Sequence, residues 1–161
     1  MGATSEPIEG PPPVPENSDV EVEISPFDGD LADVSAARAW LAAALERHDW
    51  DEADIECMKL LLSEVASNAI LHAKTSFTVT AWVDGVASVA VTDSVPNARP
   101  VVVQRKPGQG GMGMRLVASL AERWGVHTGA DGKSVWFVYV PAGASGARGP
   151  LDRGTRTTGR E

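Results

Sequence analysis

Two polar side chains that could carry out phosphate chemistry stand four residues apart near the middle of the chain. Glu64 and Asn68 lie in the segment SEVASNAILHA (63–73), whose apolar residues recur with helical spacing. Residues four apart are neighbours on one face of a helix, so the two side chains would project together. A carboxylate there could orient a nucleophile and accept its proton, and an amide oxygen could complete the octahedral shell of Mg²⁺. Taken alone, such a pair more often forms a solvated helix face.

An aspartate ends a short apolar segment farther along the chain. Asp93 follows VASVAV (86–91), which has the composition of a strand. A carboxylate at that point could accept a hydrogen bond from the exocyclic amine of adenine, whereas the carbonyl of guanine would be repelled. The simpler alternative is an aspartate that caps a turn, a role for which its side chain is well suited.

A glycine-rich turn precedes the last predicted helix. It reads GQGGMGM over residues 108–114 and leads directly into a periodic apolar segment. Glycines there would let backbone N–H groups approach phosphate oxygens, and the helix that follows would add the positive end of its dipole. A flexible hinge before a helix is the alternative. The turn is not a P-loop, because it contains no Gly-Lys-Ser/Thr, and it does not stand in an early strand–turn–helix unit.

The elements that must position these residues are predicted from the spacing of apolar residues and from turn signals. Helices are expected from Asp30 or Asp33 to Arg47, over 51–73 and over 111–123, with strands over 20–24, 76–83, 86–92, 124–128 and 133–140. Asp84-Gly85 and Asp131-Gly132 are favoured hairpin turns. This order predicts an α+β fold, a two-layer α/β sandwich whose mixed, mostly antiparallel sheet is covered by helices on one face.

Composition predicts one folded domain, over residues 20–141, between two disordered tails, 1–19 and 142–161, which have little apolar surface to bury. The net charge of −8 argues against binding to nucleic-acid phosphates. No apolar run approaches the roughly 20 residues that cross a membrane, and the N-terminus lacks the pattern of a secretory signal. We therefore expect a cytoplasmic protein, and the single cysteine, Cys57, fits a reducing compartment as a small buried residue.

The joint order of these features resembles the nucleotide site of the histidine-kinase-like ATPases, the GHKL or Bergerat fold. The shared pattern is a Glu-x-x-x-Asn helix, a hairpin, an aspartate at a strand end, a lid-length loop and a Gly-x-Gly turn that opens a helix. The sequence similarity continues in RLVASLAERWG (115–125) and GKSVW (132–136), so the resemblance covers about residues 30–140. The chain looks most similar to the anti-sigma regulatory factors that are serine/threonine kinases.

The resemblance implies a role for each matching residue. Glu64 would be the general base, Asn68 the Mg²⁺ ligand and Asp93 the residue that reads adenine, under a lid formed by residues 94–110. The triphosphate of ATP would be bound by Gly108, Gly110, Gly111, Met112, Gly113, Met114 and Arg115, with Lys106 as a further candidate. The chain departs from the family at one point. The usual Asp-x-Gly-x-Gly is replaced by DSVPN (93–97), so a weaker nucleotide affinity or a differently shaped lid is expected.

The resemblance also implies a function. Such proteins bind ATP and Mg²⁺, phosphorylate a serine of an anti-anti-sigma partner of the STAS fold, and otherwise hold a sigma factor inactive, usually as homodimers. The expected activity is therefore that of a serine/threonine kinase with no direct contact to nucleic acid or membrane. A non-catalytic ATP-binding module that acts only by sequestering its partner is the alternative. A fragment of a sensor histidine kinase is disfavoured, because the chain has no phospho-acceptor helix pair.

Overall fold

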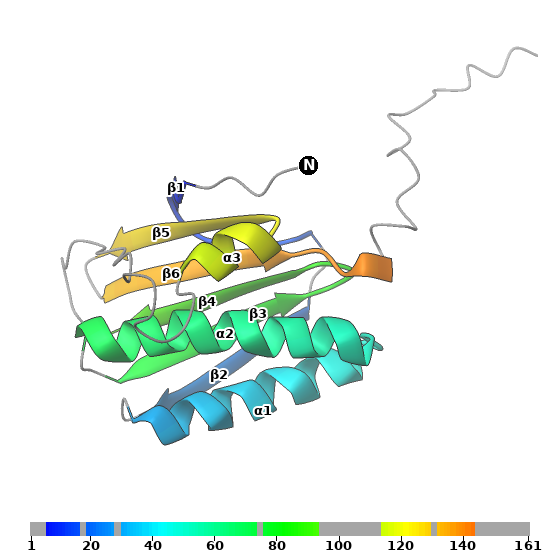
Figure 1. The fold of residues 1–161 in the computed structure, drawn as a ribbon, viewed down its shortest axis with the longest axis horizontal. Helices are drawn as coiled ribbons and strands as arrows, with labels where there is room; N and C mark the ends of the chain where they lie inside the picture. The colour runs from blue at the N-terminus through cyan, green and yellow to red at the C-terminus, as the bar shows by residue number, and fades with distance from the viewer. Residues whose placement is uncertain are drawn as a thin grey trace, which may run out of the picture.

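A sheet covered on one face by helices forms the part of the chain that the computed structural model describes, residues 6–16, 19–27, 30–73, 76–93, 114–129 and 132–143 (Figure 1). The helices are α1 (Leu31–Arg47), α2 (Glu52–Ala73) and α3 (Met114–Leu120). The strands are β1 (Ile8–Glu9), β2 (Asp19–Phe27), β3 (Phe77–Val83), β4 (Ala87–Asp93), β5 (Arg123–Gly129) and β6 (Gly132–Tyr139). The predicted α+β sandwich is confirmed.

The sheet has the strand order β1-β5-β6-β4-β3-β2. Its neighbouring strands are antiparallel except for β1 and β5, which are parallel. The β3–β4 hairpin turns at the predicted Asp84-Gly85 pair, whereas Asp131 of the second predicted turn lies outside the described residues. Because β4 pairs with β6 rather than with the next strand along the chain, the end of β4 lies beside the start of β6.

Helix α1 begins where the sequence predicts. The backbone N–H of Asp30 donates to Oδ2 of Asp33 at 3.0 Å, so an acidic side chain satisfies a donor that the first turn leaves without a partner. Residues spaced by three and four then form its buried stripe: Val34, Ala37, Leu41, Ala44 and Leu45.

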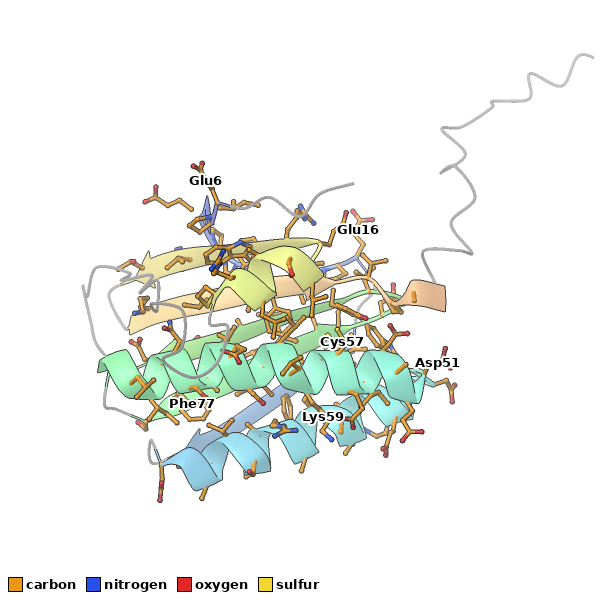
Figure 2. All side chains as sticks on the ribbon, viewed as in Figure 1. Glu6, Glu16, Asp51, Cys57, Lys59 and Phe77 are labelled. Carbon is orange, nitrogen blue, oxygen red and sulfur yellow. The ribbon has the colours of Figure 1, made fainter. Side chains whose placement is uncertain are left out.

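The core lies between the helices and the sheet, where side chains from both layers interdigitate (Figure 2). On β3 the side chains alternate between buried and half-buried, as expected for a strand with one face on the core. Phe77, labelled in Figure 2, begins this buried series and is 1% exposed. Cys57, predicted to be a small buried residue, is only half-buried, although it packs against the same core. Among the described residues, no helix combines the length and apolarity needed to cross a membrane.

The N-terminal segment differs from the expectation of a disordered tail over residues 1–19. Ile8–Glu9 form β1 against the edge of β5, the backbone N–H of Gly10 donates to the carbonyl of Val126 at 3.0 Å, and the indole N–H of Trp136 donates to the carbonyl of Gly10 at 2.8 Å. Gly125 makes this approach possible, since a Cβ there would overlap the carbonyl oxygen of Ile8 and the indole ring. The edge of β5 has backbone N–H and C=O groups that need hydrogen-bond partners. The backbone of a tail can supply those partners even when the tail has few apolar side chains.

A buried hydrogen-bonded group joins the start of α2 to the end of β6. The Tyr139 hydroxyl donates to Oδ1 of Asp54 at 2.7 Å, and the backbone N–H of Ala142 donates to the same oxygen at 3.1 Å. The ring of Trp50 lies against that of Tyr139, with 6.0 Å between the ring centroids. These contacts fix one end of α2, and the candidate site lies toward the other end.

Candidate functional site

The segments predicted to carry the site lie toward one end of the molecule. The C-terminal half of α2, the end of β4 and the start of α3 all lie toward the left in Figure 1. Helix α2 runs between α1 and α3 and contacts both α3 and β4. The fold thus gathers three segments that are separated in the sequence around the C-terminal half of α2.

Glu64 and Asn68 share a face of α2 beside its core stripe. Val65, Ala66 and Ala69 are buried in the core, and both Glu64 and Asn68 are half-buried. Leu60, four residues before Glu64, and Leu71, three residues after Asn68, lie next to the pair on the helix and are 44% and 50% exposed. The two polar side chains therefore lie at the boundary between the core stripe and the exposed face of the helix.

Asp93 is buried at the end of β4 and is 3% exposed. Its Oδ1 accepts the backbone N–H of Lys133 at 3.2 Å, and its Oδ2 lies 3.8 Å from Nζ of the same lysine. Lys133 is 5% exposed, so both members of this ion pair are shielded from water. Removing either charge would leave the other buried without compensation, which is costly.

The Asp93–Lys133 pair faces the helices. Val91 and Val135 lie two residues from Asp93 and Lys133 in their strands and belong to the core, and side chains two apart in a strand share a face. On the opposite face, the hydroxyls of Thr92 and Ser134 are 2.7 Å apart. The pair thus lies on the same side of the sheet as Glu64 and Asn68.

Sequence reasoning missed Lys133. It appeared only within the family-like segment 132–136, with no role of its own. Strand spacing can place Lys133 near the start of β6, but the partner strand of β6 across the sheet is set by topology. A buried lysine directly opposite a buried aspartate is visible only once β4 is paired with β6.

The rest of the predicted site is described only in part. Met114, at the start of α3, is buried in the core, and Arg115 is exposed. Outside the described residues lie Gly108, Gly110, Gly111, Met112 and Gly113, together with Lys106 and the predicted lid. Their roles stay predictions.

The donor set of the described site suits a metal that is bound mainly through phosphate. Among the described residues, no group of three or more His, Cys, Asp and Glu side chains is placed to hold a metal ion. A carboxylate and a carboxamide one turn apart are nevertheless hard oxygen donors, and Mg²⁺ commonly takes one or two such ligands along with phosphate oxygens and water. Asn68 fits that kind of partial shell, and Glu64 one turn before it is the predicted general base.

Two cavities formed by described residues lie away from these segments. One, of about 330 Å³, is at the start of α2 and is lined in part by Trp50 and Asp54. The other, of about 290 Å³, lies between the N-terminal segment and the sheet, with Val14 and Val138 in its lining. Neither contains any of the predicted site residues.

Comparison with known proteins agrees with the fold described above. Residues 27–139 match the family model described as the histidine kinase-like ATPase domain. The fold is similar to the crystal structure of the RsbU and RsbW domains of Rv1364c from Mycobacterium tuberculosis, with a TM-score of 0.57 and 20% sequence identity. That similarity covers 77% of this chain and 33% of the solved chain, so this chain matches about a third of its length. At this identity the likeness concerns the fold alone. No curated protein sequence matches the chain.

Proposed function

Because the chain belongs to the histidine kinase-like ATPase family, we propose that it binds ATP and phosphorylates a serine of a protein partner, as anti-sigma regulatory factors do. The observation that carries the proposal is the position of the half-buried Glu64 and Asn68 at the edge of the core stripe of α2, on the same side of the sheet as the buried Asp93. Such a site requires three functions of its side chains: a general base that accepts a proton, a metal ligand, and a carboxylate that recognises the purine ring.

Each residue has one step in the proposed mechanism. Glu64 accepts the proton of the partner's serine hydroxyl while that oxygen bonds to the γ-phosphorus and the bond to the bridging oxygen of ADP breaks. Asn68 would hold Mg²⁺, which when bound would neutralise phosphate charge. Asp93 accepts a hydrogen bond from the exocyclic amine of adenine. The backbone of the glycine-rich turn and the Arg115 guanidinium bind the phosphates.

The proposed partner is a STAS-domain anti-anti-sigma factor, with a sigma factor as the alternative binding partner of a cytoplasmic homodimer. Similarity in fold to a solved chain that carries RsbU and RsbW domains supports regulation through a protein partner. Phosphorylation would place about two negative charges on the partner's interface and release it by repulsion and desolvation.

The test is transfer of the γ-phosphate from labelled ATP to a STAS protein in the presence of Mg²⁺. Glu64→Gln is expected to lower the transfer rate by about 100-fold or more, because it removes the general base. Glu56→Gln is the matched control, since Glu56 is an exposed carboxylate on the same helix, paired with Lys59 at 2.8 Å. Transfer that survives in Glu64→Gln at the control rate would contradict the assigned role.

The second candidate function is a module that binds its partner without transferring phosphate. It is favoured by the glycine-free segment after Asp93 and by the lysine paired with that aspartate. Tight binding of the STAS or sigma partner with no label transfer from the unaltered chain would support this module and exclude the kinase.

A further inference from the structure

The pair of buried charges at the end of β4 offers a nucleotide base two kinds of hydrogen-bonding group. Oδ2 of Asp93 accepts only, and Nζ of Lys133, 3.8 Å away, donates only. We infer that Lys133 determines which purine this site selects, and that the site accepts GTP as well as ATP. The inference rests on the proposed function, because it requires the base to lie against Asp93.

The position-6 groups of the two purines explain this tolerance. Adenine carries an amine there and can donate to Asp93, whereas guanine carries a carbonyl, which a carboxylate alone repels. With Lys133 beside Asp93, the carbonyl of guanine can instead accept from Nζ, and the ammonium offsets the negative charge. Either purine can then bind in the same orientation, after a small shift of the ring from Asp93 toward Lys133.

Burial makes this choice of partner energetically important. The side chains of Lys133 and Asp93 are 6% and 2% exposed, so water competes little for their hydrogen bonds. A buried polar group left without a partner carries its full desolvation penalty, and sites built around such groups discriminate strongly between ligands. Replacing a bare carboxylate by a carboxylate–ammonium pair should therefore change base selection more than a surface charge would.

The orientation of Lys133 is set by the sheet and not by a mobile loop. Its backbone N–H donates to the carboxylate of Asp93, and its neighbours in β6 continue the ladder with β4. The alternation along β6 places Lys133 on the face of Val135, which belongs to the core between sheet and helices. The ammonium is thus held on the side from which α2 would present the Mg²⁺-bound phosphates.

The inference is tested first on the unaltered chain, by calorimetric titration with four triphosphates in the presence of Mg²⁺. ATP, GTP and ITP should bind with Kd values within about tenfold of one another, because each offers a position-6 group that one member of the pair can satisfy. Purine riboside triphosphate, which has no such group, should bind more weakly than all three. A GTP Kd more than about 100-fold above that of ATP would overturn the inference while leaving the proposed function intact. Failure of all four nucleotides to bind would overturn both.

A variant then assigns the effect to the lysine. Lys133→Met should raise the ratio of the GTP Kd to the ATP Kd by about 30-fold, since guanine would face an uncompensated carboxylate. Lys59→Met, which removes a lysine from the exposed pair with Glu56, should leave that ratio unchanged. An unchanged ratio in a folded Lys133→Met protein would overturn the inference. If that variant does not fold, the four-nucleotide series decides the question alone.

Discussion

Loss of one hydroxyl group tests how the start of α2 is attached to the sheet. In Tyr139→Phe the ring keeps its place beside Trp50, but Oδ1 of Asp54 loses the donor that lies 2.7 Å away and keeps only the N–H of Ala142. Asp54 and Tyr139 are 4% and 9% exposed, so water cannot readily replace the lost donor. Hydrogen bonds to charged groups contribute about 1.5–3 kcal/mol, so the free energy of unfolding at neutral pH should fall by about 2 kcal/mol.

The difference between the two proteins should depend on pH in a defined direction. Burial, and then the hydrogen bond to Asp54, raise the pKa of Tyr139 above its ordinary value of 10.0. Above that value the unfolded chain releases the phenolic proton while the folded chain retains it, so the unaltered protein loses stability as the pH rises. The loss is up to about 1.4 kcal/mol per pH unit, so the gap of about 2 kcal/mol should close within about 1.5 pH units above the unfolded pKa.

Denaturant unfolding of both proteins, from neutral to strongly alkaline pH, measures this gap directly. Tyr139 is the chain's only tyrosine, so the ultraviolet absorbance of the phenolate follows this group alone in the folded and the unfolded chain. The folded chain should titrate at a higher pH than the unfolded one. A gap below about 0.5 kcal/mol at neutral pH, or one that stays constant as the phenol ionises, would refute the reasoning.

Two further substitutions test the site and the N-terminal segment. Asn68→Ala should weaken Mg²⁺-dependent ATP binding by about tenfold or more, yet change the free energy of unfolding without nucleotide by only about 0.5 kcal/mol, because Asn68 is half-buried beside the core. Comparable losses in calorimetry and in unfolding would make the residue merely structural. Gly125→Ala should displace β1, since the new Cβ would overlap the carbonyl oxygen of Ile8, and hydrogen exchange at the amide of Gly10 should accelerate. Gly85→Ala, whose Cβ would meet nothing within 4 Å, should leave that exchange unchanged.

The fold was predictable wherever local chemistry determines it. The acidic cap at Asp30, the apolar stripe of α1 and the Asp84-Gly85 turn each act within a few residues, and each is confirmed. The family was predictable because its motifs follow one another in a fixed order, and the match over residues 27–139 confirms it. The individual roles of Glu64 and Asn68 stay predictions.

Contacts between distant segments were not predictable in the same way. Lys133 and Asp93 are 40 residues apart, and their pairing depends on which strand lies beside β6. The pairing of β1 depends on an open sheet edge and on the absence of a side chain at Gly125, not on apolar residues of its own. Neither contact leaves a periodic signal in the sequence, because each is created by topology.

Calorimetric titration of the unaltered chain with ATP, with and without Mg²⁺, tests most directly whether α2, β4 and the turn before α3 form a nucleotide site. Saturable binding at one site per chain, tighter with Mg²⁺ than without it, is the predicted result. Absence of saturable binding under either condition would contradict the account.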